Sequence, residues 1–367
     1  MKKVIVGISG GVDSAVAALL LKEKGYEVEG LFMRNWDSMM NNDTLGNPNF
    51  SENICPQEID YNDALKTCEI LGIKLHRVDF IKEYWDYVFT YFLDELKKGR
   101  TPNPDMLCNK FIKFDLFKKE ALKLGADYIA TGHYAKVKDN SLYRAKDQNK
   151  DQSYFLADIS KDQLNNVLFP IGDYEKTEIR AIAAEHNLNV ATKKDSTGIC
   201  FIGERHYQEF IKNYLKPNPG KIIDVATGNV IGTHTGLMNY TIGQRRNGGI
   251  NGHEERHYVC GKNVFENVLY VAFGDSTYLY SDACTLSNIN LIDKLPNRLT
   301  AKFRYRGEDI PIEVEYIEND EIKIKYPGLA KAVTPGQACV FYDGEKCLGC
   351  GFIKDIYRKG DKLWYLS

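Results

Sequence analysis

A glycine- and serine-rich turn near the N-terminus is the strongest chemical signal in this sequence. The apolar run Val4 to Ile8 leads into the turn Ser9–Ser14 (SGGVDS), and an alanine- and leucine-rich segment follows at once. A strand, a turn and a helix start in this order place backbone N–H groups and hydroxyls around one small space that suits a phosphate group. Gly10 and Gly11 permit the tight turn and let an anion approach the backbone. Asp13 would repel a bare phosphate, so either a bound Mg²⁺ or a helix-capping role would explain it.

The turn differs from two common phosphate-binding motifs. A P-loop ends in Gly-Lys-Ser/Thr, but no lysine follows Gly11, and the third glycine of a dinucleotide-binding fingerprint is missing. SGGVDS instead resembles the pyrophosphate loop (PP-loop) of ATP pyrophosphatases, which cleave ATP to AMP and pyrophosphate and often adenylate a carbonyl oxygen. The alternative is a plain glycine turn between a strand and a helix.

A second stretch, TPNPDMLCNK at residues 101–110, could activate a thiol. Its two prolines stiffen the backbone just ahead of an expected helix. Cys108 would then lie at or near the helix N-terminus, which lowers the pKa of a thiol and favours the thiolate. Asp105 lies three residues earlier, within reach of the same space. The alternative is a capped helix start with a buried cysteine.

A third stretch, DSTGICFIG at residues 195–203, contains Cys200 among residues that favour turns. We expect a loop that can move. Taken alone, this stretch is a weak signal. Two cysteines on loops beside a nucleotide site nevertheless suggest sulfur chemistry on an activated carbon atom.

The elements that must position these motifs alternate between strand and helix over residues 1–130. We expect strands at Val4–Ile8, Glu27–Met33, Lys74–Asp79 and Tyr128–Thr131, and helices at Asp13–Lys24, Asn62–Leu71, Lys82–Lys98 and Asn109–Leu124, with another at Lys176–Asn187. This alternation predicts an α/β fold in which helices cover both faces of a parallel sheet. A ligand would bind beyond the carboxyl ends of the strands, where Ser9, Met33 and Gly132 fall.

Beyond about Lys216 the sequence changes to short strand-like runs separated by turn signals. Ile310, Ile312 and Val314 alternate with proline or charged residues, which is typical of an antiparallel barrel or sandwich. We predict an N-terminal PP-loop domain at 1–205, a small β-rich central domain at 206–280 and a C-terminal antiparallel β-barrel at 281–367. Residues 35–59 form a long loop, and loops of this length are usually functional or mobile.

Composition limits the class of protein. The 367 residues are 43% hydrophobic, which allows two or three domains with substantial cores. A net charge of −2 is not the bulk signature of a nucleic-acid-binding protein, so any RNA contact must come from local basic patches. No run of 18 apolar residues occurs, so we expect no membrane span.

Cysteine usage favours a reducing, cytoplasmic setting. Nine cysteines are scattered along the chain, and an odd, scattered set does not describe a disulfide framework. Cys347 and Cys350 have metal-ligand or redox spacing but no second pair nearby. Cys55 and Cys68 lack a third cysteine nearby for an iron–sulfur cluster. We therefore predict no metal–cysteine site.

Seven motifs occur together and in order along the chain: SGGVDS, TPNPDMLCNK, ATGHYA (130–135), KDQSYFL (150–156), DSTGICFIGER (195–205), YTIGQRRNGG (240–249) and VTPGQACVFYDG (333–344). With this set the chain resembles the tRNA-specific 2-thiouridylase family over nearly its whole length. The resemblance implies an enzyme that replaces O2 of the wobble uridine in certain tRNAs with sulfur. ATP would adenylate that oxygen, and a persulfide would then supply the sulfur.

The resemblance also implies roles for individual residues. Cys200 matches the cysteine that carries the persulfide, Cys108 matches a partner that can form a transient disulfide with it, and Asp105 matches a general acid/base near the target base. The positions that bind ATP match Gly7, Ile8, Ser9, Gly10, Gly11, Val12, Asp13, Ser14, Met33 and Gly132. The positions that contact tRNA match Asn103, Pro104, Asp105, His133, Lys150, Asp151, Gln152, Arg304, Tyr305 and Gln337. The implied cofactor is ATP with Mg²⁺, and the implied partners are tRNA and a persulfide sulfur-relay donor protein.

Further basic residues could extend an RNA surface. Arg245 and Arg246 lie in a glycine-rich turn, and Arg304 and Arg306 flank Tyr305. Two arginines with an aromatic residue between them could contact RNA phosphates while the aromatic ring stacks on a base. The alternative for each arginine is a solvated strand face.

Two other functions remain open from the sequence. A different ATP pyrophosphatase, such as an amidating or ligating synthetase, would keep SGGVDS without needing Cys108 and Cys200. An RNA-binding or regulatory protein with a decayed ATP site is a second possibility, although the intact SGGVDS residues argue against decay.

Overall fold

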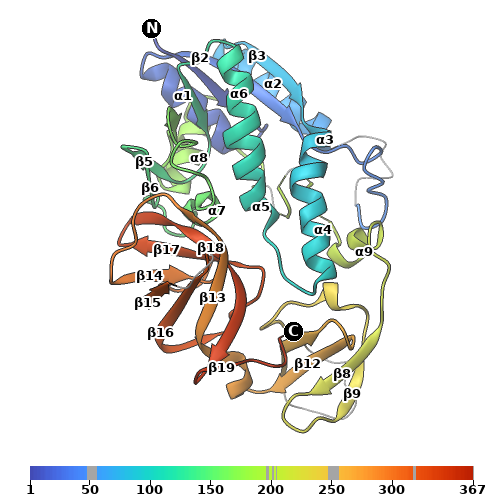
Figure 1. Ribbon diagram of the computed structural model, residues 1–367. Coiled ribbons are helices and arrows are strands. Elements are labelled where there is room, and N and C mark those ends of the chain that lie inside the picture. Colours follow the sequence, from blue (N-terminus) through green and yellow to red (C-terminus); the bar gives the residue numbers. More distant parts are fainter. Residues whose placement is uncertain are drawn as a thin grey trace.

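The computed structural model describes residues 1–47, 56–195, 198–200, 202–203, 205–246, 256–316 and 320–366. Cys55, and Ser196, Thr197 and Phe201 of the third stretch, lie outside these residues. The chain forms an N-terminal α/β part, a small sheet in the middle and a β-barrel at the C-terminal end (Figure 1). The expected fold class is thereby confirmed.

The N-terminal part is built on a five-stranded parallel sheet with the order β3-β2-β1-β4-β7. Its strands are β1 (Lys3–Gly7), β2 (Glu27–Arg34), β3 (Leu75–Asp79), β4 (Tyr128–Thr131) and β7 (Val167–Leu168). The chain runs outward from β1 to β2 and β3, then returns to the other side of β1 as β4. The order therefore reverses between β1 and β4, where open α/β sheets bind their ligands.

Helices cover both faces of this sheet, as predicted. Along β1, Val4 and Val6 face one hydrophobic core while Ile5 faces the other, which is the two-residue period of a strand. The first core includes α1 (Val12–Glu23), α2 (Pro56–Leu71) and α8 (Lys176–Glu185). The second includes α3 (Ile81–Tyr84), η2 (Trp85–Phe89), α4 (Thr90–Lys97), α5 (Pro104–Leu107), η3 (Cys108–Leu116), α6 (Phe117–Lys123) and α7 (Ser153–Leu156).

The helix expected at Asn109–Leu124 begins five residues earlier, at Pro104. Asn103 is its N-cap and accepts a hydrogen bond from the Asp105 N–H, and proline suits the first position of a helix. Cys108 therefore lies one turn inside the helix rather than at its start. The nine residues from Cys108 to Leu116 are π-helical, a form that occurs often at functional sites.

The middle part is a five-stranded sheet with the order β10-β11-β12-β8-β9. Its strands are β8 (Gly220–Asp224), β9 (Val230–His234), β10 (Arg245–Arg246), β11 (His257–Asn263) and β12 (Val268–Phe273), with α9 (Tyr207–Lys212), η4 (Leu237–Asn239) and η5 (Thr277–Leu279) beside them in sequence. The sheet is tied to the end of α4, because the buried ammonium of Lys262 donates to the Gly99 carbonyl at 2.8 Å. A cation near a helix C-terminus is favourable, while burial lowers the pKa of Lys262 to about 7.

The C-terminal part is a closed antiparallel barrel of six strands with the order β13-β16-β15-β14-β17-β18, which closes through β13–β18 pairing. These strands are β13 (Tyr280–Leu291), β14 (Leu299–Lys302), β15 (Ile310–Tyr316), β16 (Ile322–Lys331), β17 (Ala338–Asp343) and β18 (Lys346–Arg358), with β19 (Asp361–Lys362) paired to β18. Closure removes the exposed edges of the sheet. A hairpin of the N-terminal part, β5 (Lys136–Lys138) and β6 (Ser141–Tyr143), joins the barrel through β6–β18 pairing.

The first half of the long loop after β2 is held by a buried ion pair. Asp43 is fully buried, and its carboxylate accepts hydrogen bonds from Trp36 Nε1 at 3.0 Å and from the Arg205 guanidinium at 2.7 Å. The Arg205 side chain is only 5% exposed. This pair attaches the loop to the segment that follows Cys200. No helix in the described ranges is long and apolar enough to cross a membrane.

We expect Asp43→Ala to destabilise the N-terminal part by about 3–5 kcal/mol, because it leaves the buried Arg205 guanidinium without its carboxylate. Adding Arg205→Met should recover part of the loss, because the buried charge is then also gone. Asp86→Ala, which removes an exposed ion pair with Lys82, should leave the unfolding midpoint unchanged. Urea unfolding followed by tryptophan fluorescence reports all three. If Asp43→Ala matches Asp86→Ala, the buried pair contributes nothing to stability.

Candidate functional site

The glycine-rich turn is shaped by its own hydroxyls and by one close backbone contact. Ser14 Oγ accepts from the Ser9 N–H at 3.1 Å and donates to the Gly11 carbonyl at 3.0 Å, which closes the loop. Gly10 has φ +75°, and a Cβ there would lie 2.2 Å from the carbonyl oxygen of Asp60. Only glycine therefore fits the second position of SGGVDS.

The expected ATP-binding positions meet at the switch point of the sheet. A Cβ on Gly132, just after β4, would lie 2.6 Å from the Ser14 N–H nitrogen, so this strand end packs directly on the start of α1. A Cβ on Gly7 would lie 3.5 Å from Met33 Cε. The side chains of Ile8 and Val12 point into the core, so these two residues can offer only backbone groups to a ligand.

Asp13 is explained by a lysine that sequence analysis did not single out. The ammonium of Lys176 contacts both Asp13 carboxylate oxygens at 2.8 Å, and Tyr134 donates to the same carboxylate at 2.8 Å. Asp13 makes no helix-capping hydrogen bond, since Gly11 is the N-cap residue of α1. The capping role is therefore not observed, and an ion pair neutralises Asp13 beside the turn.

Two lysines connect the turn to neighbouring segments. Lys176 also pairs with Asp195 at 2.9 Å, where Lys150 contributes a second contact at 2.7 Å. Burial raises the pKa of the Asp195 carboxyl, but these lysines outweigh it and bring the pKa to about 2. Lys193 donates to the Gly10 carbonyl at 2.9 Å and pairs with Asp60. The segment that leads to Cys200 is thus tied to the turn at two points.

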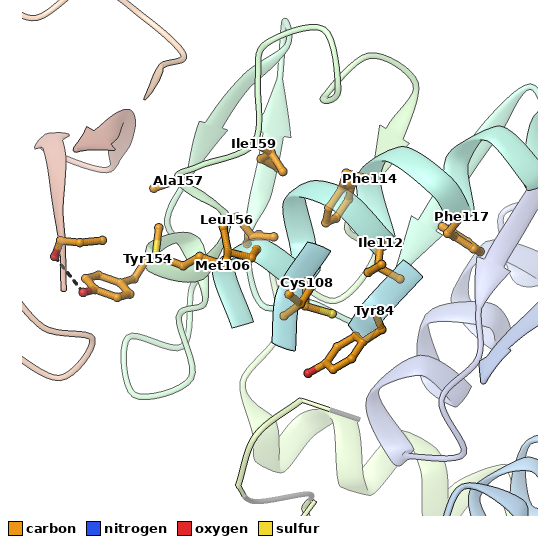
Figure 2. Close-up of a cluster of buried hydrophobic side chains, with 14 of the residues drawn as sticks. Tyr84, Met106, Cys108, Ile112, Phe114, Phe117, Tyr154, Leu156, Ala157 and Ile159 are labelled. Atoms are coloured by element: carbon orange, nitrogen blue, oxygen red, sulfur yellow. Dashed lines mark hydrogen bonds between the residues drawn. The ribbon is translucent and has the colours of Figure 1, made fainter. Parts of the chain in front are cut away.

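The two expected cysteines meet in this structure. Their Sγ atoms lie 3.9 Å apart, and both thiols are free. The Cys200 backbone is held on both sides, because its N–H donates to Asp105 Oδ1 at 3.0 Å and its carbonyl accepts from Tyr84 Oη at 2.8 Å. Figure 2 shows Cys108 and Tyr84 within the buried cluster that surrounds this point. A disulfide needs a much shorter S–S distance, about 2.05 Å, so a small movement would join them.

The expected thiolate at Cys108 is wrong. Burial raises the pKa of Cys108 well above its usual value, because the thiol lies inside the helix and is fully buried. The hydrogen bond from Cys108 lowers the pKa of Cys200, and Lys113 lowers it further. Cys200 therefore ionises more readily than Cys108, and Cys108 keeps its proton and donates to Cys200.

Burial also sets the protonation of the groups around the thiols. It raises the pKa of Asp105, although the hydrogen bond from the Cys200 N–H opposes this. A carboxyl with a raised pKa can both accept and return a proton near neutral pH. His133 Nε2 lies 3.4 Å from Lys113 Nζ, and burial holds the pKa of His133 well below its usual value.

Several expected RNA contacts are engaged within the fold. Pro104 is buried at the first position of α5. Asp151 is buried and accepts hydrogen bonds from the Ala145 N–H at 3.0 Å and the Ser153 hydroxyl at 2.8 Å. Gln152 accepts from the Tyr134 N–H at 2.9 Å. These side chains shape the site from inside, so any RNA contact must use their remaining atoms.

The expected contacts from the barrel lie at the junction between the parts. Arg304 Nη2 donates to the Ile242 carbonyl at 2.8 Å and also to the Ala332 carbonyl, and burial lowers the pKa of its guanidinium. Gln337 donates to the Thr101 carbonyl at 2.5 Å, at the start of the cysteine-bearing stretch. The ring centroids of Tyr305 and Phe155 lie 4.4 Å apart. Arg245 and Arg306 are exposed.

The described residues hold no group of three or more His, Cys, Asp or Glu side chains that could bind a metal ion. Cys347 and Cys350 are buried in strand β18, and burial raises the pKa of Cys347 to about 12. A metal-binding thiolate is disfavoured at such a position. These two residues belong to the hydrophobic core between the barrel and the N-terminal part.

Comparison with known proteins assigns the chain to a family. The family models described as tRNA methyl transferase HUP domain, tRNA methyl transferase PRC-barrel domain and Aminomethyltransferase beta-barrel domain match residues 2–204, 208–273 and 281–353. A relative named tRNA-specific 2-thiouridylase MnmA, from Mycoplasmopsis synoviae, is 57% identical over 369 residues, covering 100% of this chain and 99% of that protein. The chain belongs to the tRNA-specific 2-thiouridylase family. It is therefore an enzyme, a sulfurtransferase.

Other relatives support the same family assignment. Proteins of the same name from Mycoplasmopsis pulmonis and Metamycoplasma arthritidis are 50% and 52% identical, each covering 100% of this chain and 100% of the relative. Among solved structures, a 4-thiouridine synthetase–RNA complex with bound ATP is 16% identical with a TM-score of 0.32, covering 56% of this chain and 46% of that one. That similarity is too low to carry an argument about this 2-thiouridylase-family chain.

Sequence reasoning missed three lysines of the site. Lys176 could have been suspected, because it opens the helix at 176–187 and a cation there would face the carboxyl ends of the strands. Lys193 lies just ahead of the DSTGIC stretch, but nothing in its spacing marks it. Lys113 was hidden because α-helical periodicity does not place it beside Cys108.

We expect Gly10→Ala to weaken ATP binding at least tenfold, because its Cβ would collide with the Asp60 carbonyl and displace the turn. Gly25→Ala is the matched control, since Gly25 has φ +82° and its Cβ would have nothing within 4 Å. Both variants carry a similar backbone strain of about 1–2 kcal/mol, so their difference isolates the collision. Calorimetric titration with ATP measures it. Equal affinities in the two variants would contradict the assignment of this turn to ATP.

Proposed function

We propose that this enzyme catalyses ATP-dependent 2-thiolation of the wobble uridine of tRNA in the cytoplasm. The observation that supports this best is that the Sγ atoms of Cys108 and Cys200 lie 3.9 Å apart beside Asp105. The segment that leads to Cys200 is tied to the glycine turn through Lys176. The name of the full-length relatives supports the tRNA substrate and the position of the sulfur. An amidating or ligating synthetase would have no use for this pair of thiols.

The first step activates the uracil. O2 is a poor leaving group, so it attacks the α-phosphorus of ATP, and pyrophosphate departs as the phosphorus–oxygen bond breaks. The N3 proton of the base passes to Asp105 and on to solvent, which suits a carboxyl whose pKa is raised by burial. The adenylated oxygen can then leave as part of AMP. The target base must leave its stack to reach the buried thiols.

The second step transfers sulfur from a persulfide on Cys200. Cys200 receives the terminal sulfur of a donor protein's persulfide in advance. The terminal sulfur on Cys200 attacks C2 of the base, a carbon–sulfur bond forms, and AMP leaves with the former O2. Activation and attack thereby replace one difficult substitution by two easier steps.

The third step releases the product. Cys108 Sγ attacks Cys200 Sγ, the bond between Cys200 and the transferred sulfur breaks, and a Cys108–Cys200 disulfide remains. The Cys108 proton ends on N3 of the 2-thiouridine, carried by Asp105. The proton-bearing state of Cys108 suits this order, because the thiol stays inert until the base is attached. A dithiol must reduce the disulfide before the next turnover.

Mg²⁺ fits this site only together with ATP. Asp13 offers one carboxylate, which Lys176 and Tyr134 already contact. Mg²⁺ commonly binds through one or two carboxylates plus phosphates and water. Asp13 would hold the ion against the phosphates, where it would neutralise their charge.

We further propose that tRNA lies across the junction of the barrel and the N-terminal part. The resemblance implies Asn103, His133, Lys150, Gln152, Tyr305 and Gln337 as contacts, and of these Tyr305 and Gln337 belong to the barrel part. The exposed Arg245 and Arg306 would supply phosphate contacts at its edge. Local basic groups of this kind can bind RNA although the net charge of the chain is −2.

The route of sulfur is tested by replacing each thiol. Cys200→Ser should abolish both persulfide loading and 2-thiouridine formation. Cys108→Ser should still accept sulfur but fail to release the product. Mass spectrometry of protein and digested tRNA, with a sulfur-34-labelled persulfide donor, follows both steps, and Cys260→Ser, a buried thiol in β11, is the control. Labelled tRNA from the Cys200→Ser variant would show that Cys200 is not the carrier.

Arg304 tests the RNA surface. We expect Arg304→Ala to weaken tRNA binding and leave ATP affinity unchanged. A lost phosphate contact should also reduce the slope of log affinity against log salt by about 1. Loosening of the junction at Ile242 would instead lower the melting temperature and leave the slope unchanged. Arg306 is an exposed neighbour of Arg304. The Arg306→Ala variant therefore shows how much the slope of log affinity against log salt changes when one exposed arginine is removed. Unchanged tRNA affinity in the Arg304 variant would remove this residue from the interface.

A further inference from the structure

Lys113 reaches the thiol site because of an unusual helix geometry. It follows Cys108 by five residues within the π-helical segment η3. In an α-helix, residues five apart point about 140° away from each other around the axis. The i→i+5 hydrogen bonds of a π-helix widen the turn, so residues five apart can face the same side. Lys113 therefore approaches the thiols of both Cys108 and Cys200.

The charge of Lys113 acts on the Cys200 thiol. Its ammonium lies 3.4 Å from His133 Nε2, and after the hydrogen bond from Cys108 it lowers the pKa of Cys200 further. Burial alone would lower the pKa of Lys113, but the neighbouring Cys200 outweighs this and raises it. Lys113 is therefore charged over the physiological pH range.

His133 orients this ammonium. An ammonium has only donors, so His133 Nε2 must accept, and Nδ1 then carries the proton and donates to Thr131 Oγ1 at 2.7 Å. Burial keeps the imidazole neutral by holding its pKa well below the usual value. Gly132, between these two residues, packs on the backbone of Ser14. The ammonium is thus held from the same strand end that borders the ATP turn.

The remaining groups that face Cys200 favour a single negative charge. Tyr84 stays a phenol, because burial raises its pKa well above the usual value. The Cys108 thiol is buried, and its pKa is raised well above the usual value. Asp105 accepts from the Cys200 N–H, and burial raises its pKa. A negative charge on Cys200 is accordingly balanced by Lys113.

We propose that Lys113 is a catalytic residue that holds Cys200 as a thiolate during sulfur loading, with His133 as its positioning residue. The proposal rests on the proposed function, since it takes Cys200 as the sulfur acceptor. In loading, the Cys200 thiolate forms a bond to the terminal sulfur of a donor persulfide. The sulfur–sulfur bond of the donor breaks, and the donor cysteine leaves as a thiolate. The proton of the transferred sulfhydryl passes to the departing donor thiolate, and the terminal anion of the loaded persulfide then faces the same ammonium.

The test is the pH dependence of Cys200 alkylation by iodoacetamide, resolved by peptide mass spectrometry in the full chain. Lys113→Gln should raise the pKa of Cys200, and a rise of about 1 should slow its alkylation near pH 7 about tenfold, because the thiolate fraction falls by that factor. Above the new pKa the variant and the unmodified protein should react at equal rates. Lys113→Arg should keep most of the reactivity, because it keeps the charge.

Controls separate this role from general damage. Lys119→Gln removes an exposed lysine of the continuing helix α6 and should leave the profile unchanged. Melting temperatures check folding, and Lys113→Met, which matches the length of the apolar stem, replaces the Gln variant if that variant unfolds. His133→Phe should shift the profile in the same direction by a smaller amount.

The alkylation profile is measured without ATP or tRNA. Its result therefore tests the Lys113 proposal independently of the proposed function. If the Lys113→Gln and Lys119→Gln profiles coincide, Lys113 does not stabilise the thiolate, whatever the enzyme does to tRNA. If the profile shifts as expected but no variant or unmodified protein thiolates tRNA, the proposed function is wrong while the thiolate contact stands. In the thiolation assay, the Lys113→Gln defect should diminish as the pH is raised.

Discussion

The site depends on bringing two thiols 92 positions apart in sequence to within 3.9 Å. Helix geometry fixes Cys108, but Cys200 lies on a segment with little regular structure and must be held by side chains from elsewhere. Asp105 and Tyr84 bind its backbone on either side. Asp195, five residues earlier, is held by lysines beside the glycine-rich turn, and Arg205, five residues later, is held by the buried Asp43. These anchors together fix the position of the Cys200 thiol.

Burial and charge give the two thiols different tendencies to ionise. A buried ionised group is costly unless a partner balances it, so burial keeps Cys108 and His133 uncharged. Among the described residues, Cys108 and Lys113 both lower the pKa of Cys200. The two cysteines therefore differ in how readily they ionise because their environments differ.

The barrel and the central sheet both contact the segment that leads to Asp105 and Cys108. Gln337 donates to the Thr101 carbonyl, and a Cβ on Gly336 would lie 2.8 Å from Arg100 Cβ, so the barrel loop packs tightly on the start of TPNPDMLCNK. Lys262 of the central sheet binds the Gly99 carbonyl just ahead of it. The stretch that carries Asp105 and Cys108 is therefore clamped by all three parts of the chain.

The sequence alone determined the parallel α/β core and the barrel, and it singled out Cys108 and Cys200 as a candidate pair. These predictions rest on local signals: strand alternation, glycines that a tight turn requires, and motifs that occur in order. The sequence could not determine the charge state of Cys108, since burial overrides a helix dipole and burial is a property of packing. It also could not find Lys113, because the π-helix that turns this residue toward Cys108 breaks the 3.6-residue period on which sequence patterns rely. Lys176 and Asp13 are separated by 163 positions, and only the folding of α8 against α1 makes them a pair.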